Sequence, residues 1–135
     1  MSSLPRPERK DYVAASFDGL LLLLDQDEVS MVEQAERIGE APATVHSLSG
    51  ALRRMQGSQR PLFLIARHAS GAFGLACDEV RVVKAGRVEL HPLPASLRTE
   101  RSPFRAYASV GERIGFHCSA AHLAGLLDEA DHGEH

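Results

Sequence analysis

Three side chains near the carboxyl end of the chain are of types that bind transition metals: His117, Cys118 and His122. Zinc takes three or four such ligands, each about 2.0–2.3 Å from the ion. A strand end followed by a helical turn would supply two of them, but no carboxylate or second cysteine stands at a spacing that completes the set. We therefore expect no metal, and keep a small metal-binding protein or enzyme using these three residues as an alternative hypothesis.

The two cysteines, Cys77 and Cys118, both lie in apolar segments. A catalytic thiolate needs an electropositive and partly exposed setting. Asp78 and Glu79 follow Cys77 directly, and their negative charges would raise the pKa of its thiol. The pattern instead indicates two buried thiols in a reducing cytoplasm. The sequence predicts neither an enzyme nor a cofactor.

Length and charge narrow the classes of partner. The 135 residues predict one domain, and 44% apolar with 24% charged residues is ordinary for a globular protein. A net charge of −3 gives no basic excess to attract nucleic acid or an anionic membrane. The longest apolar run, residues 20–24, is too short to cross a bilayer. The composition therefore gives no support for a nucleic-acid or membrane partner.

An opening hairpin is predicted on either side of Asp18-Gly19. This dipeptide favours a two-residue turn between two strands, here residues 11–17 and 20–24. The second strand is apolar without alternation, so we expect both of its faces to be covered. Asp78 is expected to hold a later bend by accepting hydrogen bonds from nearby backbone amides.

Further short strands and one terminal helix follow the hairpin. The final helix would be capped by Ser119 and present Leu123, Leu126 and Leu127 on one face. Many short strands spaced by turns favour a barrel-rich fold over an alternating βαβ sheet. The predicted strands are residues 62–66, 73–83 with an interruption near Cys77, 88–91, 104–109 and 113–117.

Two segments in the first half are harder to assign. Leu48, Ala51, Leu52 and Met55 have helical spacing, so residues 47–55 predict a short middle helix that ends before Gly57. Residues 25–39 fit a helix or a strand equally well.

Three stretches of the sequence resemble the CheW-like family of chemotaxis coupling proteins. The best match is residues 73–83, FGLACDEVRVV, which is similar to the family's "GLxVDxVxxV" strand pair. Phe17-Asp18-Gly19, the apolar run after it and Glu28-Val29 resemble the opening hairpin. Residues 90–97 and 104–127 resemble the late "PLP" stretch, the closing hairpin and the terminal helix.

The resemblance implies a mainly β fold of two small SH3-like β-barrel subdomains, with a short middle helix and a C-terminal helix. The family's "GxxxxRGxxxPxxDL" stretch has no counterpart in residues 44–54, and the segment between Val32 and His46 is shorter than the family pattern. Whether the first barrel is complete is therefore left open. We expect a lead-in over residues 1–10, a single domain over 11–130 and a flexible tail over 131–135.

The resemblance also implies a function. Members are non-catalytic adaptors or scaffolds that bind a histidine kinase regulatory domain, a chemoreceptor or another CheW-like protein. Because the segment that is absent contributes to partner contacts in the family, a degenerate modulator with a single partner is a variant of this hypothesis. By position, the expected partner-binding residues are Glu28, Val29, Val32, Glu79, Val80, Arg81 and Val83.

Overall fold

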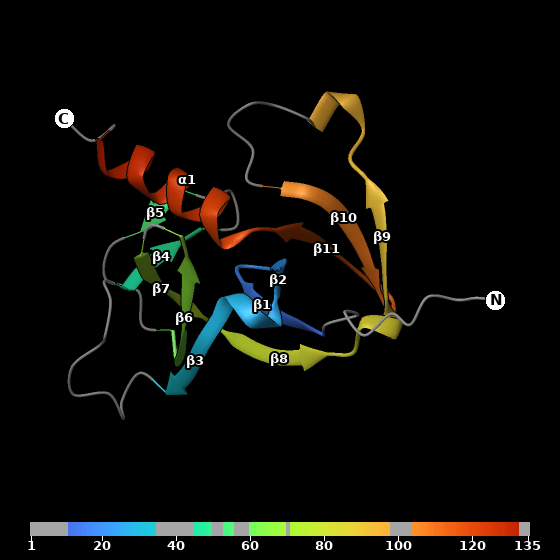
Figure 1. Ribbon diagram of the computed structural model, residues 1–135, viewed down its shortest axis with the longest axis horizontal. Coiled ribbons are helices and arrows are strands. Elements are labelled where there is room, and N and C mark those ends of the chain that lie inside the picture. Colours follow the sequence, from blue (N-terminus) through green and yellow to red (C-terminus); the bar gives the residue numbers. More distant parts are fainter. Residues whose placement is uncertain are drawn as a thin grey trace.

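In the part of the chain that it describes, the computed structural model has two β-sheets and one terminal α-helix (Figure 1). It describes residues 11–34, 45–49, 53–55, 60–69, 71–97 and 104–132. The first sheet has the strand order β8-β1-β2-β11-β10-β9 and the second the order β3-β6-β7-β4-β5. The strands of the first sheet are β1 (Tyr12–Phe17), β2 (Leu20–Asp25), β8 (Glu79–Val83), β9 (Val88–Pro92), β10 (Phe104–Val110) and β11 (Arg113–Cys118). Those of the second are β3 (Val29–Gln34), β4 (Val45–Leu48), β5 (Arg54–Met55), β6 (Leu62–His68) and β7 (Gly71–Cys77).

The helical elements connect or close these sheets. The α-helix α1 (Ala120–His132) packs against β6 of the second sheet, so the end of the chain returns to the middle of the fold. No helix in the described ranges is both long and apolar enough to span a membrane. In the part of the chain that the structure describes, short 3-10 helices link strands: η1 (Gln26–Glu28), η3 (Ala85–Arg87) and η4 (Ala95–Leu97).

The opening hairpin forms as predicted. Phe17 pairs with Leu20 across a two-residue turn in which both Asp18 (φ 50°) and Gly19 (φ 80°) have positive φ. Such a turn matches the right-handed twist of the strands that it joins, and aspartate and glycine are among the residues that tolerate it. The local sequence thus sets the register of β1 against β2.

The β1–β2 hairpin is shared by two hydrophobic cores, which explains why β2 shows no alternation. Leu22 and Leu24 point into a larger core between the two sheets and α1, whereas Leu21 and Leu23 point into a smaller core on the other face of the first sheet. Successive strand residues face opposite sides, so a strand covered on both sides must be apolar throughout. The smaller core consists of Ala14, Leu21, Leu23, Val83 and Ala108. The larger core consists of Val13, Ala15, Phe17, Leu22, Leu24, Leu48, Leu64, Ala66, Phe73, Leu75, Cys77, Cys118, Ala120, Leu123, Ala124 and Leu127.

The predicted middle helix is wrong wherever the structure describes residues 47–55, and residues 50–52 lie outside the described part. Its first residues belong to β4, where Val45 and His46 pair in parallel with Gly74 and Leu75 of β7. Its end belongs to β5, which pairs with β4 antiparallel. A helical spacing of leucines is a local signal, and these ladders outweigh it because β4 gains a hydrogen-bonded neighbour on each side while Leu48 becomes fully buried.

The segment that fitted a helix or a strand is a strand where the structure describes it. After η1, strand β3 alternates between half-buried and exposed side chains, as expected for a strand at the surface of a sheet. The remainder of that segment, including Gly39, lies outside the described residues.

The predicted mainly β, two-subdomain organisation is confirmed, but the ladders are open sheets. Within the described residues, neither terminal pair of strands, β8 with β9 or β3 with β5, is hydrogen-bonded into a closed barrel. The predicted strands in the second half, the break before β8 and the helix after Ser119 are also present. Helix α1 extends to His132, within the predicted tail, and residues 1–10 lie outside the described part.

Candidate partner-binding surface

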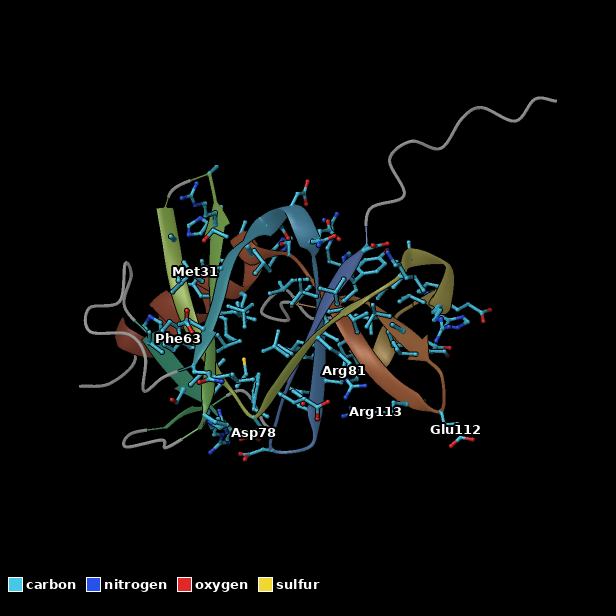
Figure 2. The ribbon with its side chains drawn as sticks, turned by 90° about the horizontal axis from the view of Figure 1, so that it is seen from below. Met31, Phe63, Asp78, Arg81, Glu112 and Arg113 are labelled. Carbon is cyan, nitrogen blue, oxygen red and sulfur yellow. The ribbon has the colours of Figure 1, made fainter. Side chains whose placement is uncertain are left out.

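Both segments predicted to bind a partner fall at the edge of a sheet, on strands β3 and β8, with Glu28 directly before β3. Strand β3 is the terminal strand of the second sheet and β8 is the terminal strand of the first. The two views place these strands on the same side of the molecule, which is the lower side in Figure 1 and faces the viewer in Figure 2. An edge strand carries backbone N–H and C=O groups without a neighbouring strand, so this side offers two places for a partner to pair or pack.

The β3 segment presents one exposed valine beside two residues that support the fold. Val32 is 41% exposed. Val29 is half-buried and packs against the larger core. Glu28 is half-buried as well, and its Oε1 accepts a hydrogen bond of 3.3 Å from the backbone N–H of Ala120, the first residue of α1. Of these three predicted residues, Val32 has the side chain most available to a partner.

The β8 segment also contains both packed and exposed side chains, and these side chains alternate between the two faces of the sheet. Val80 is half-buried against the larger core, whereas Val83 is 8% exposed within the smaller core. Glu79 and Arg81 are exposed and form an ion pair with each other. The structure thus leaves Glu79 and Arg81 as the charged groups that this edge presents to solvent.

A buried arginine holds the start of β8 in place, and sequence reasoning missed it. Arg60 is 9% exposed, and its guanidinium lies 3.2 Å from Oδ1 of Asp18 and 3.7 Å from Oδ1 of Asp78. The same guanidinium lies over the Phe17 ring, 4.9 Å from its centroid, and donates a hydrogen bond of 3.5 Å to the carbonyl of Ala76. This group ties the β1–β2 turn to the bend between β7 and β8.

Asp78 occupies the bend as predicted, but its backbone partner is distant in the sequence. Its Oδ2 accepts a hydrogen bond of 3.2 Å from the backbone N–H of Asp18. The bend is therefore fixed across two turns and by Arg60, and not by amides next to Asp78. An arginine directly before a buried strand, together with aspartates at two predicted turns, was the available sequence signal.

The three residues of the alternative metal-binding hypothesis, His117, Cys118 and His122, do not form a set of metal ligands in the described part of the chain. Among the described residues, no three His, Cys, Asp or Glu side chains come together in a way that would hold a metal ion. Nε2 of His117 lies 2.9 Å from Oδ1 of Asp25, on the neighbouring strand β2. Nδ1 of His122 lies 2.6 Å from Oγ of Ser119, which also accepts the His122 backbone N–H and so caps α1. The sequence neighbours thus have separate structural roles.

Both thiols are buried, and burial is the main reason that they are poor nucleophiles. It raises the pKa of Cys77 to about 12, with a further increase from the charge of Asp78 and an opposing effect of Arg60. The sequence pointed to adjacent carboxylates as the cause, but desolvation is the larger one. The pKa of Cys118 is likewise raised to about 12 by burial, with smaller contributions from Glu28 and Asp25.

Three features define the architecture. The β1–β2 hairpin contributes to two hydrophobic cores, and the strands of the second sheet come between β2 and β8 in the sequence. Helix α1 packs back against β6. No protein-family model matches the chain, and no curated protein matches it. Among solved structures, the chain is similar to the crystal structure of scaffolding protein TtCheW from Thermoanaerobacter tengcongensis, with a TM-score of 0.58 and 18% sequence identity. The match covers 82% of this chain and 88% of that chain. The fold is therefore CheW-like, as the sequence resemblance implied.

Proposed function

We propose that this protein is a non-catalytic adaptor or scaffold in a bacterial chemosensory pathway, acting in the cytoplasm. The observation that carries the proposal is the CheW-like fold, shared with a protein described as a scaffold. The partner is a histidine kinase regulatory domain, a chemoreceptor or another CheW-like protein. Because a fold alone does not define a function, the proposal depends equally on the surface formed by β3 and β8.

This surface combines an apolar contact with charges at its border. Val32 is the exposed apolar side chain that a partner would cover, and Glu79 with Arg81 would set orientation. Apolar anchors supply most of the affinity of such contacts, while charges at the border contribute mainly to specificity. Glu28, Val29, Val80 and Val83 complete the proposed site by holding the two edge strands in position.

The decisive experiment measures binding of the purified chain to purified partners. The kinase regulatory domain and a receptor cytoplasmic fragment from the same organism would be titrated by isothermal calorimetry. We expect at least one of them to bind, and Val32→Glu to weaken the dissociation constant at least tenfold because it places a charge in the apolar contact.

A matched control separates the site from general effects of an added charge. Val45 is 37% exposed and lies on β4, away from the β3 edge in the same sheet. Val45→Glu should change the dissociation constant less than threefold. Val80→Glu is the poorer choice, since Val80 packs against the core and a buried glutamate would destabilise the fold. If neither of these partners, nor a CheW-like protein from the same organism, binds the wild-type chain, the adaptor proposal fails.

The single-partner variant is tested in the same titrations. Its motivation is the segment between Val32 and His46, which is short against the family pattern. A chain that binds the kinase domain or the receptor, but not both, would support a modulator. A ternary complex on size-exclusion chromatography would contradict it.

A further inference from the structure

The β8 edge also borders an open groove on the side of the smaller core. The groove has a volume of about 580 Å³ and lies between β8, the η3 segment and the turn from β10 to β11. Its lining residues are Arg81, Val82, Val83, Lys84, Arg87, Val110 and Gly111. It lies along β8, which is a terminal strand of the first sheet.

The lining of the groove is basic, in contrast to the chain as a whole. It contributes three cationic side chains and no acidic one, whereas the whole chain carries a net charge of −3. Arg113 adds a fourth cation at the turn, where it pairs with Val110 of β10. In Figure 2, Arg81 and Arg113 are next to each other in projection, with Glu112 further out at the turn. An acidic ligand is the complementary occupant.

The cations of the groove are available to a ligand. Lys84 is 78% exposed, and its Nζ lies 3.4 Å from Asp11. Arg81 is 69% exposed where it pairs with Glu79. Ion pairs with a solvent-exposed cation contribute little to stability, so carboxylates of a ligand can replace Glu79 and Asp11 as partners of these cations. Arg87 is exposed and has no ion-pair partner among the residues that the structure describes.

The edge of β8 defines the shape of the occupant. One side of the strand is paired with β1, and the other side has no strand beside it in the described ladders. Side chains alternate along β8, so Arg81 and Val83 face the smaller core while Val82, 56% exposed, faces the opposite way. An added strand would therefore meet a cation on one face and an exposed valine on the other.

We propose that this groove binds an extended acidic segment of a partner protein, which adds a strand to the free edge of β8 with acidic and apolar side chains in alternation. The proposal holds whether or not the chain acts as an adaptor, since it rests on the edge and the charges alone. A second copy of this chain is a poor occupant, because symmetric antiparallel pairing centred on Arg81 would set like charges opposite each other. Backbone pairing would supply affinity, and the cations would select for acidic sequences.

The test uses a fluorescein-labelled octapeptide of alternating glutamate and valine, titrated against the full chain by fluorescence anisotropy. We expect saturable binding that weakens with added salt. Amide chemical shifts should change in β8 and around Gly111. The double variant Lys84→Glu with Arg87→Glu should weaken the dissociation constant at least tenfold. Its control is Arg67→Glu with Arg105→Glu, two exposed arginines outside the groove, which changes net charge equally and should alter binding less than twofold.

Two control peptides separate strand addition from simple charge attraction. A lysine–valine octapeptide should not bind, and a glutamate peptide with prolines at alternate valines should lose binding because proline removes the backbone donors. The proposal is overturned if the glutamate–valine peptide fails to bind, or if the lysine peptide binds as well. It is also overturned if the proline peptide binds equally or if both double variants weaken binding to the same extent. Circular dichroism of each variant shows that it is folded before it is titrated.

Discussion

The side chain of Glu28, just before β3, accepts a hydrogen bond from the backbone N–H of Ala120 at the start of α1. The first amides of a helix have no partner within the helix, and a carboxylate there also interacts favourably with the helix dipole. A residue that the sequence resemblance placed in a partner contact thus also connects the beginning of the second sheet to the last element of the fold.

This contact predicts a structural cost for losing the Glu28 carboxylate. Glu28→Ala should lower the free energy of unfolding by about 1 kcal/mol, in the range for helix N-terminal caps, and Glu28→Gln by less because an amide oxygen still accepts the bond. Urea denaturation followed by circular dichroism measures both. Glu112→Ala, an exposed turn residue, is the control and should be close to neutral. Equal effects of Glu28→Ala and Glu112→Ala would show that the cap contributes nothing.

Arg60 is expected to be the most sensitive charged position in the described structure. Arg60→Met keeps the apolar stem but removes the guanidinium that lies beside both Asp18 and Asp78. Both carboxylates are about half exposed, so we expect a loss of about 2 kcal/mol and not the larger cost of a fully buried pair. Arg60→Lys should recover only part of it, because lysine lacks the planar fork. Chemical denaturation measures the free energy of unfolding, with the exposed Arg67→Met as the reference variant. A loss for Arg60→Met no greater than that for Arg67→Met would contradict the prediction.

Gly74 is required where β7 approaches β4. A Cβ at this position would lie 2.8 Å from Cγ2 and 3.1 Å from the backbone Cα of Val45. Because a backbone atom must shift, Gly74→Ala should cost about 1–3 kcal/mol and loosen β4 from β7. Thermal unfolding measures the loss of stability. Hydrogen exchange of the His46 and Leu75 amides measures how far the pairing of β4 with β7 is loosened. Gly86→Ala meets nothing within 4 Å and should be neutral or slightly stabilising. Similar behaviour of the two substitutions would contradict the close approach.

The two thiols predict a characteristic dependence on pH. Their pKa values are raised from 9.0 to about 12 in the folded chain, so the unfolded chain loses these protons first as pH increases. The contribution of the two buried, protonated thiols to the free energy of unfolding is fully present below about pH 9 and is lost as pH rises toward 12. A disulfide reagent at pH 8 should modify neither thiol rapidly in the native chain and both in urea. Fast modification of either native thiol would show that it is not buried.

Local signals in the sequence predicted local features well. Asp18-Gly19 specified a turn whose positive φ angles depend on those two residues alone, and Ser119 specified the cap of α1 through an oxygen three residues from the amide it binds. The apolar run of β2 predicted a strand covered on both faces, because burial on two sides requires apolar side chains at every position.

Features that depend on distant segments were beyond the sequence pattern. Residues 47–55 have a helical spacing, but β4 is a strand because β7 lies beside it. Arg60 was missed because its partners Asp18 and Asp78 come from turns far away in the chain. Among the predicted contact residues, the sequence did not distinguish Val32, which is exposed, from Val83, which is buried, because both lie in short valine-containing strands.

The parallel pairing of β2 with β11 has a consequence for how the chain is made. Phe116 and His117 pair with Leu22 and Leu23, so a strand synthesised after the whole second sheet completes a sheet that was begun before it. During translation the β1–β2 hairpin emerges before the second sheet, and the leucines of β2 have no β11 neighbour until β3 to β10 have also been synthesised. Contacts between such distant segments form slowly because a long loop must close first. The nascent chain therefore passes through an interval in which its most apolar strand is incompletely covered, and that interval is where aggregation would compete with folding.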